Sequence, residues 1–211
     1  MCSSDLAERG AEGRHFKSVV LDGGILLAGF DYSGKSVNVL DADSIAAWQE
    51  VVRQARETDA VTAVVLVSLK EATFCAGANL ELIHDAQARR AYDEIEQLVT
   101  TVHQLFDDMA SSAKPFVAAV EGACIGGGLE LALGCHFRVA SPDARVGLPE
   151  VNLGIFPGAA GTQRLPRVAG LDHALEMIVS GKPIGAATAH DYGIVDEIVE
   201  GDLRAGAVAF A

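Results

Sequence analysis

The sequence predicts a single α/β domain, and three observations lead to this fold class. Short apolar runs alternate along the chain with stretches whose apolar residues recur every three or four positions, an order typical of strands followed by helices. Half of the 211 residues are hydrophobic, which is enough for one core. Only 6% are aromatic whereas 22 are glycine, which indicates closely packed backbone layers.

The composition also excludes several classes of protein. A disordered tail, a collagen-like fibre or a disulfide-stapled miniprotein would be far less apolar or far more biased. The balance of 16 Lys and Arg against 29 Asp and Glu gives a net charge of −13, which disfavours nucleic acid and anionic membranes as partners. No apolar run reaches the roughly 18 residues that a membrane helix needs. We therefore expect no nucleic-acid or membrane partner.

The cysteines and the N-terminus indicate the compartment. The four cysteines form no Cys-x-x-Cys pair and have no histidine at metal-ligand spacing, so we expect reduced thiols and no metal site. The acidic N-terminus does not have the pattern of a signal peptide. These features predict a cytoplasmic protein.

The N-terminal segment predicts a leader followed by a hairpin. Residues 1–14 are polar and without periodicity, and we interpret them as a disordered leader to a domain that spans residues 15–211. Residues 17–21 and 25–30 flank Asp22-Gly23-Gly24, whose glycines accept a positive φ, so they predict a β-hairpin.

The next segments predict two helices with a strand between them. Apolar residues recur at helical spacing from Ile45 to Ala55, with Asp41 or Asp43 as the N-cap. The continuous apolar run at 63–67 predicts a strand buried on both faces. The apolar stripe over residues 95–109 is the clearest helical pattern in the chain.

The second half of the chain predicts further strands and helices. Residues 116–120 predict a buried strand, residues 129–133 a short apolar helix, and residues 137–140 and 145–146 two short strands paired with each other. Helices resume from Gly161, and the predicted elements there are a helix at 171–179, a strand at 194–199 and a helix beginning at 202–211.

Two glutamates lie in otherwise apolar, glycine-rich surroundings. Glu130 stands in Gly-Gly-Leu-Glu-Leu-Ala-Leu and Glu150 in Gly-Leu-Pro-Glu-Val. A buried carboxylate must be paired, hydrogen-bonded or protonated, because an isolated buried charge is costly. The pair is therefore a candidate for general acid–base catalysis, whereas the alternative is two carboxylates at the solvent-exposed rims of their elements.

The glycine triplet at residues 126–128 precedes the short apolar helix. Glycines allow backbone N–H groups to approach a ligand oxygen, and the N–H groups at a helix start are unpaired. The triplet therefore predicts either an oxyanion hole or a phosphate cradle. It has neither the Gly-Lys-Ser/Thr ending of a P-loop nor the Gly-x-Gly-x-x-Gly of a dinucleotide site.

Three segments taken together resemble the enoyl-coenzyme A (CoA) hydratase/isomerase, or crotonase, family. They are Phe-Cys-Ala-Gly-Ala-Asn-Leu at 74–80, the run from Lys-Pro to Glu-Gly at 114–122 that leads into the glycine triplet, and the run from Gly-Leu-Pro-Glu to Thr-Gln-Arg at 147–164. The resemblance covers roughly residues 16–199. It implies an α/β crotonase-type spiral of β-β-α repeats whose C-terminal helices are missing, so that the domain is truncated at its C-terminus.

The resemblance also implies roles for individual residues. The oxyanion hole corresponds to the N–H groups of Ala78 and Gly127, and the catalytic pair corresponds to Glu130 and Glu150. We assign Glu150 as the acid and Glu130 as the base that orients water, although the sequence does not decide between the two orders. The implied substrate-binding residues are Ala76, Leu80, Gly126 and Gly158. Asn79 stands where the family more usually has aspartate.

The implied activity is hydration of trans-2-enoyl-CoA to 3-hydroxyacyl-CoA in fatty-acid β-oxidation. Residues 134–140 and 163–167 are most similar to the hydratase half of bifunctional enzymes that also carry a 3-hydroxyacyl-CoA dehydrogenase. No cofactor is expected, because CoA is part of the substrate and NAD would be needed only by a following dehydrogenase domain. A homo-oligomer or a fusion to that domain is the expected assembly. The alternatives are a 3,2-enoyl-CoA isomerase and a non-catalytic acyl-CoA binding module.

Overall fold

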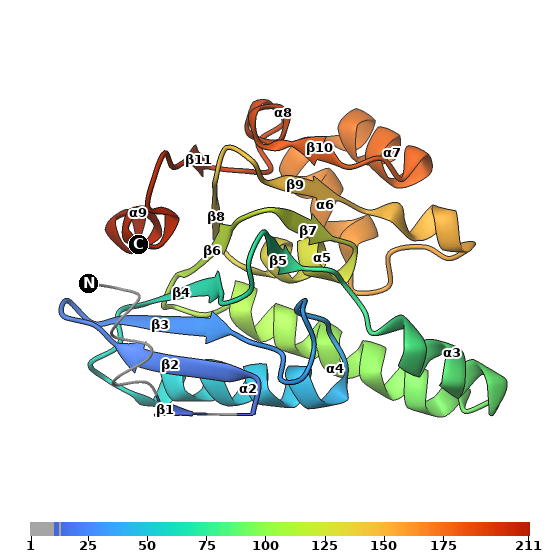
Figure 1. Cartoon of the computed structure of the whole chain (residues 1–211), viewed down its shortest axis with the longest axis horizontal. Coiled ribbons are helices and arrows are strands. Elements are labelled where there is room, and N and C mark those ends of the chain that lie inside the picture. The colour runs from blue at the N-terminus through green and yellow to red at the C-terminus, as the bar shows by residue number, and fades with distance from the viewer. Residues whose placement is uncertain (1–10, 13) are drawn as a thin grey trace.

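Two mixed β-sheets, with helices packed around them, make up the structure, a computed structural model that describes residues 11–12 and 14–211 (Figure 1). The larger sheet has the strand order β1-β2-β3-β4-β6-β8-β11. Its strands are β1 (Ala11–Glu12), β2 (Phe16–Val20), β3 (Ile25–Phe30), β4 (Ala63–Ser68), β6 (Phe116–Val120), β8 (Phe137–Ala140) and β11 (Glu197–Ile198). The first three strands are antiparallel, and the pairs from β3 to β11 are parallel.

The smaller sheet has the order β10-β9-β7-β5. It consists of β5 (Thr73–Cys75), β7 (Ala123–Ile125), β9 (Arg145–Gly147) and β10 (Ile184–Gly185), of which only the β9–β10 pair is antiparallel. Each of β4, β6 and β8 in the large sheet is followed in the chain by one strand of the small sheet and then by a helix. The predicted spiral of β-β-α repeats is therefore confirmed.

The helices surround the two sheets. They are α2 (Ala42–Glu57), α3 (Leu80–Ala88), α4 (Tyr92–Ala110), α5 (Gly127–Gly134), the 3₁₀ helix η1 (Pro149–Leu153), α6 (Gly161–Ala169), α7 (Leu171–Ser180), α8 (Ala186–Asp191) and α9 (Leu203–Phe210). Helices α2 and α4 lie along one face of the large sheet, and α9 packs on β4, β6 and β8 (Figure 1). In the part of the chain that is described, no helix is long and apolar enough to cross a membrane.

Several predicted elements are confirmed, and the structure makes their bounds sharper. The hairpin is β2–β3, the strand at 63–67 is β4, and the two clearest helices are α2 and α4. Asp41 rather than Asp43 is the N-cap of α2, because its side chain accepts the Ser44 N–H in a capping box. The short apolar helix begins at Gly127, so two of the three glycines form its first turn.

The predicted pairing of residues 137–140 with 145–146 is wrong. Strand β8 joins the large sheet beside β6, whereas β9 joins the small sheet beside β7. Each strand adds in parallel to the strand of the preceding repeat, so the residues between them cross from one sheet to the other instead of turning back.

The predicted strand at 194–199 is also mostly wrong, since only Glu197 and Ile198 are paired as a strand. The N–H groups of Ile194 and Val195 both donate to the Ala189 carbonyl at the end of α8, at 2.8 and 3.2 Å. These residues are buried but belong to a turn that closes the helix.

Most of the predicted leader, residues 1–10 and 13, lies outside the described residues. Ala11–Glu12 forms β1 and pairs antiparallel with β2.

Candidate active site

A short ladder of backbone hydrogen bonds fixes the loop that follows β5. The N–H of Ala76 donates to the Asn38 carbonyl at 2.9 Å, and Leu40 both donates to the Gly77 carbonyl and accepts the Asn79 N–H, each at 2.8 Å. Because residues alternate in an extended segment, the ladder leaves the Ala78 N–H on its opposite side. The predicted binding residues Ala76, Ala78 and Leu80 are accordingly exposed, whereas Gly77 and Asn79 are buried.

The N-terminus of α5 meets this loop. A Cβ built on Gly127 would lie 3.4 Å from the Ala78 nitrogen, and a Cβ built on Gly77 would lie 3.2 Å from the Gly127 nitrogen. Gly77 has a φ of +95°, which favours glycine. Among the described residues, neither the Ala78 nor the Gly127 N–H has a hydrogen-bond acceptor. The structure thus brings two unpaired donors together at the positive end of a helix.

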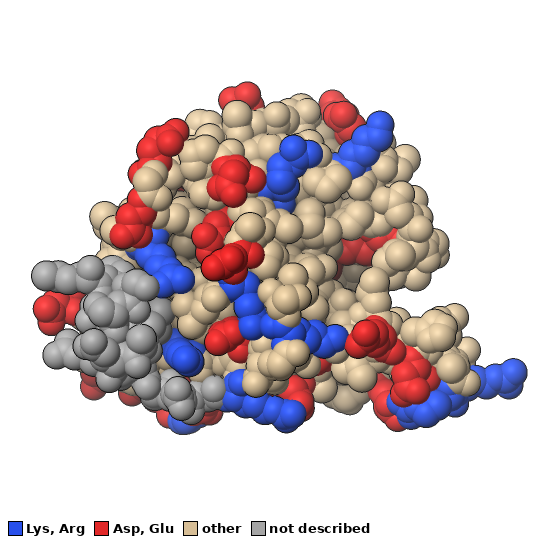
Figure 2. Space-filling view, viewed as in Figure 1, with Lys and Arg blue, Asp and Glu red and all other residues tan. Residues whose placement is uncertain are grey.

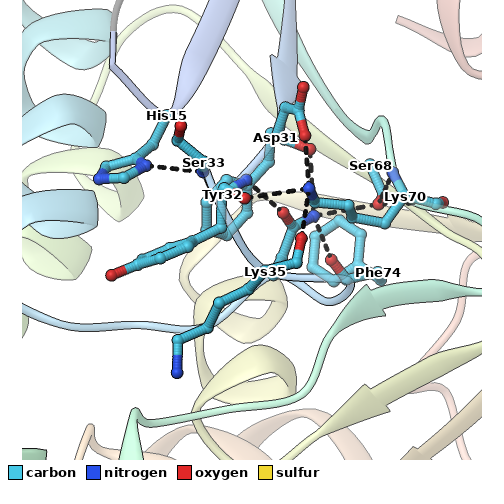
Figure 3. A network of polar contacts seen from close by, with 10 residues as sticks. His15, Asp31, Tyr32, Ser33, Lys35, Ser68, Lys70 and Phe74 are labelled. Carbon is cyan, nitrogen blue, oxygen red and sulfur yellow. Dashed lines mark hydrogen bonds and ion pairs between the residues drawn. The ribbon is translucent and has the colours of Figure 1, made fainter.

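A partly buried polar network supports the segment that carries Asn38 and Leu40 (Figure 3). The Lys70 ammonium group donates to the carbonyls of Tyr32 and Lys35 at 3.0 and 2.8 Å and pairs with the Asp31 carboxylate at 2.6 Å. The Asn38 amide, which is fully buried, donates to the Phe30 and Phe74 carbonyls and to Ser68 Oγ. This network ties the ends of β3, β4 and β5 to the segment at 32–38. That segment leads into Leu40, whose backbone holds the loop with the unpaired Ala78 N–H group.

Glu130 lies in the first turn of α5 and is 2% exposed. Its Oε1 accepts the N–H groups of Ala159 and Gly161 at 2.8 and 2.7 Å. Burial raises the pKa of Glu130 to about 7; the hydrogen bond from Gly161 opposes this shift and the negative charge of Glu150 adds to it. A carboxyl group with this pKa can exchange protons near neutral pH.

Glu150 lies in η1 and is 9% exposed. Burial raises its pKa, although its own backbone N–H opposes the shift. Its Oε2 is buried and has no hydrogen-bond partner among the described residues. An unpartnered buried carboxyl oxygen favours the protonated form, because a proton removes the charge that burial makes costly.

Gly126 lies beside both glutamates, next to the carboxyl group of Glu150 and the backbone of Glu130. A Cβ built on it would lie 2.9 Å from Glu150 Oε1, and its carbonyl accepts the Glu130 N–H at 3.0 Å. Its φ of +57° with a ψ of −127° is a backbone conformation that glycine adopts readily. The glutamates that are 20 positions apart in the sequence thus border the same glycine turn as the free N–H groups.

Gly158 lies in the loop that holds Glu130. Its carbonyl lies 2.7 Å from His103 Nε2, while the next N–H, that of Ala159, donates to Glu130. A cleft of about 460 Å³ borders this loop and is lined by residues that include His103, Phe156, Gly158 and Arg164. Neither Glu130 nor Glu150 is among the residues that line it. The positions of Gly126 and Gly158 are compatible with the predicted binding role, which stays a prediction.

The surface next to the site is hollowed and partly apolar. Figure 2 shows a notch between the projecting part that contains α3 and the part above it, with acidic and basic side chains interspersed over this face. The exposed large apolar residues of α3 and of η1 and the loop after it are Leu80, Leu82, Val151, Leu153, Ile155 and Phe156. Such a surface suits a ligand with an apolar portion.

Sequence reasoning missed His103, because 55 positions separate it from Gly158 and no local pattern links them. Cys75, in the motif at 74–80, is fully buried, which raises the pKa of its thiol to about 12. Arg164, which lines the cleft, forms a salt bridge with Asp107 at 2.7 Å.

The chain is similar to known proteins in both its sequence and its fold. A sequence model of the family described as Enoyl-CoA hydratase/isomerase matches residues 27–209. An enoyl-CoA hydratase from Bacillus anthracis is 30% identical with a TM-score of 0.83, covering 93% of this chain and 74% of that chain. An enoyl-CoA hydratase from Polaromonas sp. JS666 is 30% identical with a TM-score of 0.85, covering 92% and 75%. Pseudomonas aeruginosa DspI is 28% identical with a TM-score of 0.85, covering 97% and 81%.

Proposed function

Because the chain belongs to the enoyl-CoA hydratase/isomerase family and so acts on acyl-CoA thioesters, we propose that it hydrates trans-2-enoyl-CoA to 3-hydroxyacyl-CoA. The observation that carries this proposal is the convergence of two unpaired N–H groups with two buried carboxyl groups around one glycine turn. Two oriented donors serve an oxygen that gains charge, and two carboxyl groups serve a reaction that takes one proton and gives another.

The N–H groups of Ala78 and Gly127 bind the thioester carbonyl oxygen in this proposal. Hydrogen bonding to that oxygen withdraws electrons from the conjugated double bond, so C3 becomes electrophilic and the enolate that forms is stabilised. Each such donor contributes on the order of 2.7–4 kcal/mol to the transition state.

The two glutamates then carry out one proton transfer each. Glu130, whose carboxylate is fixed by two N–H groups, takes a proton from water as the oxygen bonds to C3. Glu150, whose unpartnered oxygen favours protonation, delivers a proton to C2 as the enolate collapses. The reaction adds H and OH across the double bond and leaves Glu130 protonated and Glu150 ionised. Before the next turnover Glu130 releases its proton to water and Glu150 takes one up from water, so no net proton is gained or lost.

The proposal extends to the setting of the reaction. We place it in fatty-acid β-oxidation, where 2-enoyl thioesters are the substrates of hydration. The likeness to the hydratase half of bifunctional enzymes rests on the motifs alone, because the comparisons support the family and not this subtype. A homo-oligomer or a fusion to a dehydrogenase domain stays a prediction.

Three substrates distinguish the proposal from its alternatives. With crotonyl-CoA in ¹⁸O-labelled water, we expect loss of the conjugated enoyl-thioester absorbance and one labelled oxygen at C3 of the product. An isomerase would instead convert trans-3-hexenoyl-CoA to the conjugated 2-enoyl thioester, which raises that absorbance, and would leave crotonyl-CoA unchanged. A protein that binds the non-hydratable butyryl-CoA but changes the absorbance of neither crotonyl-CoA nor trans-3-hexenoyl-CoA would contradict the proposal in favour of a binding module.

His103 is expected to assist this reaction through the peptide between Gly158 and Ala159. Its Nε2–H donates to the carbonyl of that peptide, whose N–H holds Glu130, and hydrogen bonds linked in this way strengthen each other. His103→Ala is expected to lower kcat by about 2–10-fold, the value of one hydrogen bond. His103→Gln, which can still donate, should recover part of the loss in the same assay. Gln104→Ala, an exposed neighbour on α4, is the control and should keep wild-type kcat.

A further inference from the structure

Asn79 follows Ala78 of the proposed oxyanion hole, and its side chain does not cap the helix that begins after it. Asn79 is the N-cap of α3, where asparagine normally accepts a hydrogen bond from the first helical turn, yet it makes no such bond. Its Nδ2 donates instead to Asp41 Oδ2 at 3.1 Å. The two residues are only 7% and 3% exposed, so this contact is shielded from solvent.

The carboxylate of Asp41 accepts a hydrogen bond from each of the three groups that hold it. Its Oδ1 accepts the Ser44 N–H at 3.1 Å, and its Oδ2 accepts the Tyr32 hydroxyl at 2.5 Å as well as the Asn79 amide. Burial is the largest influence and raises the pKa of Asp41, but the hydrogen bonds from Tyr32, Asn79 and Ser44 together lower it below its ordinary value. An ionised carboxylate offers only acceptors, so the residue facing it must be a donor.

We infer that Asn79 and Asp41 form a matched amide–carboxylate pair that positions the Ala78 N–H of the oxyanion hole. The backbone of Leu40 already holds Gly77 and Asn79, the two neighbours of Ala78. The hydrogen bond of the Asn79 side chain to Asp41 adds a further hold on the residue after Ala78. Ala78 is thereby fixed on both sides, and its N–H stays directed beside that of Gly127. Asn79 is thus a positioning residue, and this role rests on the proposed function.

The pair explains why an amide rather than a carboxylate suits position 79. A carboxylate at position 79 would face the Asp41 carboxylate across a hydrogen-bond distance in a buried setting, where like charges repel strongly. The loop would have to move to separate them. Since Ala78 precedes this residue directly, the movement would displace the donor from the thioester oxygen.

The experiment exchanges the two side chains. Asn79→Asp is expected to lower kcat for crotonyl-CoA by about 10–100-fold, because a displacement of about 1 Å can cost 10²-fold, while KM changes by less than about threefold. The double variant Asp41→Asn with Asn79→Asp restores a donor facing a carboxylate and keeps an acceptor for Ser44. It is expected to recover kcat to within about fivefold of wild type.

The control is Gln87→Glu, which adds one carboxylate at an exposed position of the same helix and should keep wild-type kcat. If Asn79→Asp does not fold, Asn79→Ala removes the donor without adding charge and should lower kcat by about 3–10-fold. The inference is overturned if the double variant is no more active than Asn79→Asp, or if neither single variant at position 79 differs from the control.

A second readout separates this inference from the proposed function. Bound acetoacetyl-CoA forms an enolate that absorbs in the near ultraviolet, and the oxyanion hole stabilises that enolate without any hydration step. The enolate band should weaken in Asn79→Asp and return in the double variant even if the wild-type protein does not hydrate crotonyl-CoA. If the band is the same in the wild type, Asn79→Asp, the double variant and Gln87→Glu, Asn79 does not position the hole.

Discussion

Glu130→Gln is expected to lower kcat for hydration of crotonyl-CoA by about 10²–10⁴-fold, the contribution typical of general acid–base catalysis. Glutamine keeps an oxygen that accepts the N–H groups of Ala159 and Gly161, so the loop should stay in place and KM should change little. It cannot take a proton from water. The loss of enoyl absorbance measures the effect, and Glu176→Gln, an exposed glutamate on α7, is the matched control. Wild-type activity in Glu130→Gln would contradict the assignment.

The same substitution is expected to stabilise the fold at alkaline pH. Because burial raises the pKa of Glu130 from 4.5 to about 7, the wild-type protein loses stability as the pH rises through this range and the buried group ionises. Glutamine does not titrate, so it avoids a cost of about 3 kcal/mol above pH 7, at 1.36 kcal/mol for each pKa unit. Below pH 4.5 the two proteins should have equal stability.

Urea denaturation at pH 4.5 and pH 8.5 measures this difference in the free energy of unfolding. Glu176→Gln should show no such dependence on pH, because its side chain is exposed. If the difference in the free energy of unfolding between Glu130→Gln and wild type is the same at pH 4.5 and pH 8.5, Glu130 is not desolvated. If Glu130 is catalytic and its burial destabilises the fold, its replacement by glutamine should lower activity and raise stability together.

Gly128→Ala is expected to lower kcat by about 10²–10³-fold, which is the effect of losing one oxyanion donor. A Cβ on Gly128 would lie 2.3 Å from the Cys75 carbonyl oxygen, and this backbone atom cannot move aside cheaply. The first turn of α5 would therefore separate from the loop after β5, and with it the Gly127 N–H from the Ala78 N–H. Both kcat for crotonyl-CoA and the enolate band of acetoacetyl-CoA should fall.

Gly185→Ala is the matched control, since a Cβ there would contact nothing within 4 Å. Circular dichroism and binding of free CoA, which has no thioester carbonyl, show whether Gly128→Ala remains folded. A folded Gly128→Ala protein with wild-type kcat would contradict the proposal that these two N–H groups form the oxyanion hole.

Local patterns were sufficient for the elements whose signal lies within a few residues. The helical stripe of α4 and the hairpin β2–β3 depend on periodicity and a turn, which the chain carries locally. The strands β8 and β9 were found, but their partners were not, because pairing depends on the earlier strands β6 and β7. A short apolar segment contains no information about which sheet it joins.

The same distinction applies to the candidate site. The glycine turn, the two glutamates and the small residues of the loop after β5 were identifiable from their order in the chain, and so was the family. The supports of the site come from distant segments: Asp41 lies 38 positions from Asn79, and His103 lies 55 from Gly158. Nothing near Asn79 in the sequence indicates that a buried carboxylate faces it.

The sequence by itself therefore determined the class of fold and the family and supplied the candidate groups for the chemistry, because each depends on residue type and local spacing. Only the tertiary structure decided which oxygens and N–H groups face one another, how far burial raises the pKa of Glu130, and which side chains hold the loop. These properties arise from packing between segments that are far apart in the chain. At a separation of about 3 Å, two groups attract or repel each other strongly, depending on which groups the fold brings together.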